Sequence, residues 1–92
     1  MRFLFKKGRI DLLLYLHKKK SARHNEILNQ GFVRSRSSVS IMLNELEKNN
    51  LIKRVVVSTK PPQTSYELTE YGKRIVQYLQ GIDETIRAAV SK

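Results

Sequence analysis

Residues 35–50 read SRSSVSIMLNELEKNN, and their pattern predicts an amphipathic helix. The apolar members follow the i, i+3, i+4, i+7 spacing of one helical face: Val39, Met42, Leu43 and Leu46. Ser35 is a favourable N-cap, because its hydroxyl can accept a hydrogen bond from a free amide of the first turn. Asn49 and Asn50 tolerate the left-handed conformation that often ends a helix. We therefore expect a helix over about residues 35–49.

The opposite face of this helix has the chemistry of a DNA-contacting surface. Its members are short, polar or basic, with one apolar residue among them: Arg36, Ser37, Ser40, Ile41 and Asn44. Such side chains can reach base edges in the major groove, where each base pair shows a distinct pattern of donors and acceptors. Arg36 could contact guanine or a phosphate, and Asn44 could reach adenine or a phosphate. Ile41 could meet a thymine methyl group or be a partly covered hydrophobe.

The positive charge of the chain is confined to its first two thirds. Residues 1–60 hold 14 Lys and Arg against 4 Asp and Glu, and residues 61–92 hold 4 against 4. The net charge of +10 therefore lies entirely in the first segment. A basic segment joined to a neutral one favours a polyanion-binding half over a charge that only maintains solubility. A basic surface without a partner is the alternative.

Length and composition exclude several classes of protein. A chain of 92 residues forms one small domain with a modest core, so an oligomer would add stability. The absence of cysteine excludes disulfides, thiolate metal sites and thiol redox sensing, and it fits a reducing compartment. No apolar run approaches the roughly 20 residues of a membrane span, and residues 1–5 are too short for a signal peptide. We expect a soluble, cytoplasmic protein.

Two further helices are expected before residue 35. Residues 9–19 are apolar around most of the helix circumference, which is typical of a centrally buried helix. The lysines at 18–20 complement the helix dipole and could also lie against a phosphate backbone. Ser21 could cap a second helix that ends at Gly31 in the left-handed conformation. Residues 1–7 could form a strand, a helix extension or an arm.

After residue 50 the sequence predicts a β-hairpin and a long helix. Residues 51–59 are rich in β-branched side chains, residues 60–65 contain two prolines, and residues 66–68 alternate, so strand, loop and strand are expected in turn. Thr69 can cap a helix that continues to about Val90. Five of its apolar residues have the 4, 3, 4, 3 spacing of a coiled-coil seam: Ile75, Leu79, Ile82, Ile86 and Ala89. At about 1.5 Å per residue this helix would span roughly 33 Å, so its far half is expected to pack on a second copy.

The order of elements and two motifs resemble a known superfamily. Residues 35–52 contain Ser-x-Ser-Ser-Val-Ser and Leu-x-x-Leu-Glu-x-x-x-Leu-Ile, which resemble the recognition helix and following strand of MarR-like regulators. Residues 66–72 are similar to the Tyr-x-Leu-Thr-x-x-Gly segment that closes the wing in MarR-like, PadR-like and HxlR-like families. The resemblance covers about residues 9–80. The small size, basic charge and long last helix are also similar to winged-helix proteins of archaea and their viruses.

The resemblance implies a fold and a division of the chain. The fold would be α+β, mainly α: a winged helix-turn-helix with a three-helix core, a two-stranded β-wing and a long C-terminal dimerisation helix. Residues 1–68 would form the DNA-binding part and residues 69–92 the dimerisation helix, within one structural domain. The sequence departs from many relatives in its longer turn between Gly31 and Ser35 and in a proline-bearing wing without arginine at its tip.

The DNA contacts follow from how such a fold docks. A recognition helix enters the major groove with its N-terminal residues near base edges, and wing residues 58–66 would lie on the backbone or in the minor groove. Only one of Lys53 and Arg54 can face the DNA, because the faces of a strand alternate. The expected DNA-binding residues are Arg34, Ser35, Arg36, Ser37, Ser38, Ser40, Ile41, Asn44, Arg54 and Lys60.

These features favour a homodimeric, sequence-specific regulator that binds double-stranded DNA. A sequence-independent architectural DNA-binding protein and a protein-interaction module are the alternatives. We do not expect an enzyme, because no Gly-rich phosphate loop and no believable catalytic constellation is present. His17 and His24 lack a third ligand, so no metal or other cofactor is expected. Whether a small-molecule effector exists is left open.

Overall fold

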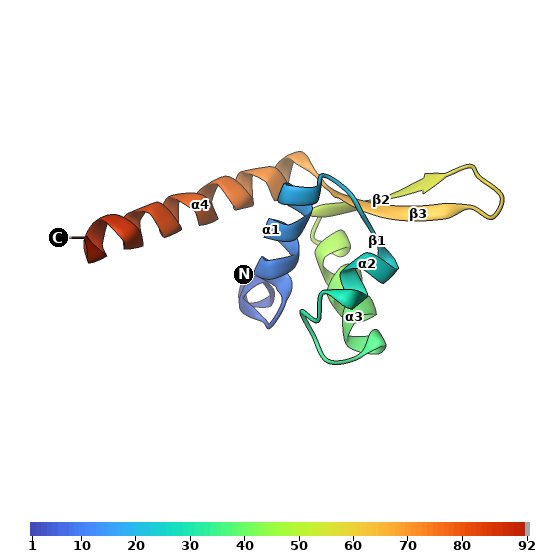
Figure 1. The fold of residues 1–92 in the computed structure, drawn as a ribbon, viewed down its shortest axis with the longest axis horizontal. Coiled ribbons are helices and arrows are strands. Elements are labelled where there is room, and N and C mark those ends of the chain that lie inside the picture. Colours follow the sequence, from blue (N-terminus) through green and yellow to red (C-terminus); the bar gives the residue numbers. More distant parts are fainter. Residues whose placement is uncertain (92) are drawn as a thin grey trace.

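The computed structural model describes residues 1–91 and orders them as three helices, a β-hairpin and a long last helix (Figure 1). The elements in chain order are η1 (Arg2–Phe5, a 3-10 helix), α1 (Arg9–Lys19), β1 (Ala22–Arg23), α2 (His24–Asn29), α3 (Arg36–Lys48), β2 (Ile52–Val57), β3 (Gln63–Leu68) and α4 (Glu70–Val90). The strands form one antiparallel sheet in the order β1-β3-β2. The mainly helical α+β winged helix-turn-helix expected from the sequence is confirmed.

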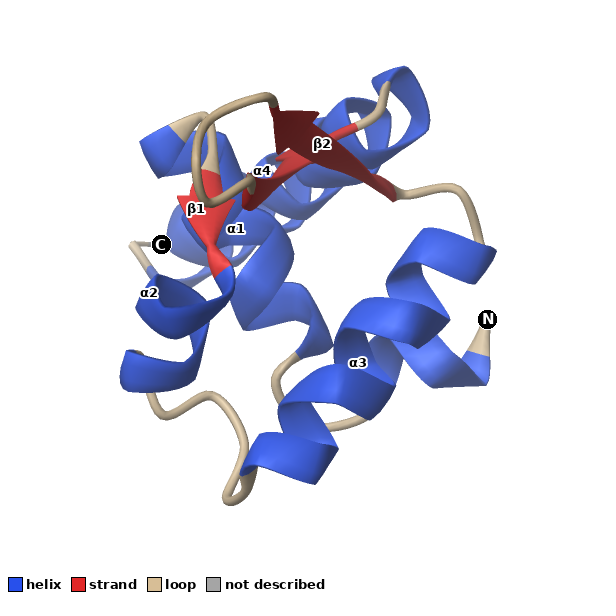
Figure 2. Ribbon diagram, turned by 90° about the vertical axis from the view of Figure 1, so that its right-hand side faces the viewer, coloured by secondary structure: helices blue, strands red, loops and turns tan. Residues whose placement is uncertain are grey.

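The core lies where the apolar faces of α1, α2 and α3 meet the sheet. Figure 2 shows α1 between α2 and α3, with the sheet at one end of the three helices. The apolar face predicted for residues 35–50 is fully enclosed, since Val39, Met42, Leu43 and Leu46 are each at most 2% exposed. Burial of a face of this size is the main force that holds a helix of 13 residues in place.

The wing is longer than the sequence pattern indicates. Strands β2 and β3 pair from Ile52 opposite Leu68 to Val57 opposite Gln63, so β3 begins three residues before the predicted Tyr66. The two prolines occupy the turn, where no ladder hydrogen bond requires their amide. The hairpin projects from the body on the side opposite the free end of α4 (Figure 1).

The predicted start of the second helix is wrong. Helix α2 begins at His24 with Arg23 as its N-cap, and the Glu26 carboxylate accepts a hydrogen bond from the Arg23 backbone N–H at 3.1 Å. Ser21 is not the cap, because Ala22 and Arg23 are extended and pair with β3 as strand β1. A two-residue strand has no periodic pattern, and its partner lies far along the chain.

The last helix is attached firmly at its base and exposed along its far half. The Thr69 backbone N–H donates to the Leu51 carbonyl at 3.1 Å, and the Thr69 hydroxyl donates to the Asn50 carbonyl at 2.6 Å. Val76 is buried and Ile75 is half-buried, whereas every described residue from Gln80 onward is exposed. No helix within residues 1–91 has the length and apolarity needed to cross a membrane.

Candidate nucleic-acid interface

The outward face of α3 is exposed and organised by a cap at its N-terminus. The Ser35 hydroxyl accepts a hydrogen bond from the Ser38 backbone N–H at 3.1 Å and lies 3.1 Å from the Ser37 hydroxyl, with which it shares a hydrogen bond. The same hydroxyl donates to the Ser38 Oγ at 3.0 Å. These contacts hold the first turn of α3 in one geometry. The cap predicted at Ser35 is therefore confirmed.

Most of the residues predicted to contact DNA lie together around this turn. Seven of them are exposed: Arg34, Ser35, Arg36, Ser37, Ser40, Ile41 and Asn44. Ser38 is half-buried, and Ile41 is 58% exposed despite its apolar side chain. Among residues 1–91, no carboxylate lies within ion-pair distance of Arg34 or Arg36. Both guanidinium groups therefore keep their donors for an external acceptor.

The wing lies along one flank of α3. Arg54 of β2 forms an ion pair with Glu47 of α3 at 3.4 Å, and the next residue back, Lys53, pairs with Glu67 on the opposite face of the sheet at 3.9 Å. Arg54 is thus the one of the two that lies near α3, as strand alternation requires. Its charge is partly offset by Glu47. Lys60 is exposed in the turn of the hairpin.

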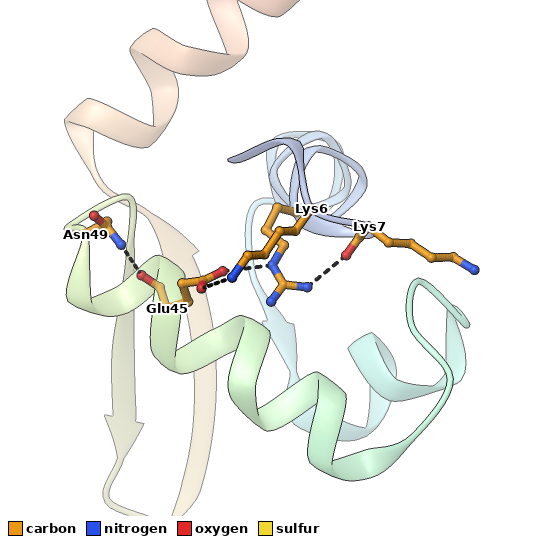
Figure 3. Close-up of polar contacts among 5 residues, drawn as sticks. Lys6, Lys7, Glu45 and Asn49 are labelled. Atoms are coloured by element: carbon orange, nitrogen blue, oxygen red, sulfur yellow. Dashed lines mark hydrogen bonds and ion pairs between the residues drawn. The ribbon is translucent and has the colours of Figure 1, made fainter. Parts of the chain in front are cut away.

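The N-terminal segment lies along the other flank of α3 (Figure 3). The Glu45 carboxylate accepts hydrogen bonds from the Arg9 Nε at 3.0 Å and the Lys6 Nζ at 3.2 Å. Arg9 is only 7% exposed, and its second donor reaches the Lys7 carbonyl at 2.9 Å. Burial alone would raise the pKa of Glu45, but the hydrogen bonds and charges of Arg9 and Lys6 outweigh it and hold that pKa below its ordinary value. The network clamps α3 to the start of α1.

Three basic residues near the interface are absent from the set predicted from the sequence. Lys48 is exposed and continues the outward face of α3, since it follows Ile41 by seven residues and Asn44 by four. That spacing was a usable signal. Lys6 and Lys7 carried no such signal, because only the folded chain brings residues 6 and 7 to the flank of α3.

The described residues offer little to a metal or an enclosed ligand. No group of three or more potential metal-ligating side chains comes together within residues 1–91. A hollow of about 640 Å³ lies where the end of α1, the sheet and the base of α4 meet, and its lining mixes lysines with glutamates. Lys53–Glu67 and Lys73–Glu70 are already paired there.

Comparison with known proteins assigns this geometry to a family of regulators. Residues 6–92 match the model of the HxlR-like helix-turn-helix family. The sequence matches none of the curated proteins. Many solved structures are similar in fold. A transcriptional regulator of the MarR family from Enterococcus faecalis is 20% identical, with a TM-score of 0.89 over 98% of this chain and 81% of that chain.

Two further solved structures share the fold. The reduced form of the transcriptional regulator YodB from B. subtilis is 26% identical, with a TM-score of 0.74, and the match covers 88% of this chain and 79% of that chain. A transcriptional regulator homologue from Pyrococcus horikoshii is 21% identical, with a TM-score of 0.72 and coverage of 92% and 88%. In each case the similarity extends over most of both chains.

Proposed function

The chain belongs to the HxlR-like helix-turn-helix family, and from this premise we propose that it is a sequence-specific regulator of transcription that binds double-stranded DNA as a homodimer. Helix α3 enters the major groove, and the wing, residues 58–66, lies on the backbone or in the minor groove. We also propose that the protein acts in the cytoplasm. The alternative is a sequence-independent architectural DNA-binding protein, which the net charge of +10 also favours.

The outward face of α3 carries the proposal. It presents a free guanidinium at Arg36, two short hydroxyl side chains, an exposed apolar side chain at Ile41 and an amide at Asn44, all on one face. Such a face suits base edges, because arginine pairs with guanine, asparagine with adenine and an apolar group with the thymine methyl. For a surface that binds only phosphates, a lysine-rich face would suffice.

The exposed half of α4 supports the homodimer. Four large apolar side chains along it are between 57% and 79% exposed: Tyr78, Ile82, Ile86 and Val90. An isolated helix with such a stripe loses stability in water unless another surface covers it. A second copy of α4 offers a matching stripe, and the resulting two-fold symmetry would set two recognition helices about 34 Å apart on one face of the DNA. We propose Ile75, Leu79, Ile82, Ile86 and Ala89 as the dimer seam.

Selection of bound DNA from a random pool tests the proposal. We expect one enriched motif with two related halves about one helical turn, roughly 10 base pairs, apart. In mobility shifts at about 150 mM salt, the selected DNA should bind at least about a thousandfold more tightly than scrambled DNA. Arg36→Ala and Asn44→Ala should reduce this ratio. Lys19→Ala should not, because the end of α1 lies against α4 rather than α3, with the His17 Nε2 3.4 Å from the Gln80 Nε2, so a phosphate contact by residues 18–20 is not expected. Equal affinity for both DNAs would favour the architectural alternative.

Sedimentation equilibrium tests the dimer separately. The wild-type chain should sediment as a dimer, and replacement of both Ile82 and Ile86 by lysine should give a monomer that keeps its helical circular dichroism. The monomer should bind a full two-half site with the weak affinity of a single half site. A wild-type chain that stays monomeric at micromolar concentration, with and without DNA, would contradict the dimer.

A further inference from the structure

A small hollow lies beside the recognition helix, on the flank away from the wing. Its volume is about 280 Å³. The residues that line it come from the turn before α1, the turn before α3 and the first half of α3: Lys7, Arg9, Val33, Arg34, Ser38 and Ile41. The hollow is smaller than the sites of about 300–1,000 Å³ that enclose drug-sized ligands. It therefore has room for one small chemical group of a ligand that binds at the surface.

The turn that carries Lys7 is held rigidly against the turn before α3. Gly8 has a φ of +89°, and a Cβ there would lie 2.9 Å from the Val33 Cγ1 and 3.0 Å from the Phe32 carbonyl oxygen. The backbone at residue 8 is thus in direct contact with residues 32–33. On the other side, the buried Arg9 donates to the Lys7 carbonyl at 2.9 Å. Lys7 consequently extends from a backbone whose position relative to Arg34 is fixed.

The basic residues of this flank divide into two that are paired and two that are free. Lys6 and Arg9 both bind Glu45 of α3. Lys7 and Arg34 have no carboxylate within ion-pair distance among residues 1–91. Figure 3 shows the Lys7 side chain directed away from Glu45. The pair Lys7 and Arg34 supplies only donors, so its natural ligand is an anion with several acceptor oxygens.

We infer that Lys7 and Arg34 together bind one phosphate of the DNA backbone. This inference rests on the proposed function, because it takes α3 to lie in the major groove. That groove is about 12 Å wide and is bordered by a phosphate strand on each side. Glu47 places the wing on one flank of α3, and Glu45 places the N-terminal segment on the other. The wing therefore faces one phosphate strand, and Lys7 with Arg34 faces the other.

The two residues differ in what they bring to the phosphate. Arginine offers a planar fork of donors that fits two phosphate oxygens, and lysine offers a compact charge. Contacts to phosphate fix the register of a protein on DNA but carry no base preference. Lys7 is thus a positioning residue, and its removal should weaken binding to every sequence by the same factor.

The salt dependence of DNA binding tests the inference. Each neutralised phosphate contributes about 0.9 to the slope of log affinity against log salt concentration. Removal of both donors in the double variant Lys7→Ala/Arg34→Ala should therefore lower the slope by about 1.8 for a dimer, and Lys7→Ala alone should lower it by a smaller amount. The ratio of affinities for selected and scrambled DNA should stay unchanged. Lys7→Arg should restore the wild-type slope. The control Lys19→Ala removes the same charge from the distant end of α1 and should leave the slope as in wild type.

DNA with one uncharged methylphosphonate per half site locates the contact. At one position the substitution should weaken wild-type binding but have no further effect on Lys7→Ala/Arg34→Ala, because that variant lacks both donors to the phosphate. A Lys7→Ala slope equal to that of wild type, or equal losses for Lys7→Ala and Lys19→Ala, would overturn the inference. Equal binding of selected and scrambled DNA by the wild-type protein would contradict the proposed function instead. The salt slope would then still show whether Lys7 contacts a phosphate.

Discussion

Replacement of Gly72 by alanine should destabilise the protein, although alanine is the better helix former. Gly72 lies in the first turn of α4 and is buried. A Cβ there would overlap the Leu51 carbonyl oxygen and lie 3.1 Å from the Leu68 Cδ2. The Leu51 carbonyl also accepts the Thr69 backbone N–H at 3.1 Å, so it cannot move away freely. The base of α4 would have to shift instead.

The expected cost follows from three terms. Overpacking of a filled site costs about 1–3 kcal/mol. Weakening of the two hydrogen bonds from Thr69 to the carbonyls of Asn50 and Leu51 adds about 1 kcal/mol each. The better helix propensity of alanine returns about 1 kcal/mol. The sum is a loss of roughly 3 kcal/mol, and at about 4–8 °C per kcal/mol it lowers the Tm by roughly 12–24 °C.

Urea denaturation followed by circular dichroism measures this cost, at one fixed protein concentration because the stability of the proposed dimer would depend on it. Gly81→Ala is the matched control in the same helix, since a Cβ at Gly81 meets nothing within 4 Å. It should stabilise the protomer by about 1 kcal/mol. If Gly72→Ala were as stable as Gly81→Ala, the close approach of α4 to Leu51 would be wrong.

Three further predictions concern α3 and the end of α1. The pKa of Glu45 is lowered in the folded protein, so the stability that its ionised carboxylate contributes is fully present above the ordinary glutamate pKa of about 4.3 and is lost as pH falls through the folded pKa. Between about pH 5 and pH 3, Glu45→Gln should therefore lose less stability than wild type. Equal losses for the two proteins in urea titrations would contradict this. Ser35→Ala should lower the free energy of unfolding by about 1 kcal/mol because it removes the cap of α3, whereas Ser40→Ala should change it by less than about 0.5 kcal/mol, both measured by thermal unfolding. Lys20 has a φ of 74°, so Lys20→Gly should raise the unfolding free energy by about 1 kcal/mol, and a decrease would show that the backbone there is unstrained.

The elements that the sequence predicts well are those specified by neighbouring residues. The cap at Ser35, the 3.6-residue period after it and the left-handed end at Asn50 lie within one segment, and each has its expected geometry. Thr69 likewise caps α4 through the Gly72 N–H. Signals of this kind need no knowledge of distant contacts.

The features that the sequence could not predict depend on contacts between distant residues. Strand β1 exists because Ala22 pairs with Tyr66. The position of residues 1–7 follows from Lys6 and Arg9 meeting Glu45 of α3, a pair of partners separated by almost half the chain. The candidate site was therefore found in its α3 part, whose face is periodic, and missed in its N-terminal part.

The hydrogen bonds from Thr69 to Asn50 and Leu51 have a consequence for protein engineering. The base of α4 is joined to two residues of the turn that follows α3, so the angle between these helices is set by one small junction. A chimera that takes only residues 24–48 from a relative would keep this protein's junction, which would not be matched to the relative's helix. Exchange of the outward side chains of α3, with the junction left intact, should transfer DNA preference between relatives and, in the proposed dimer, preserve the distance between the two halves of the binding site.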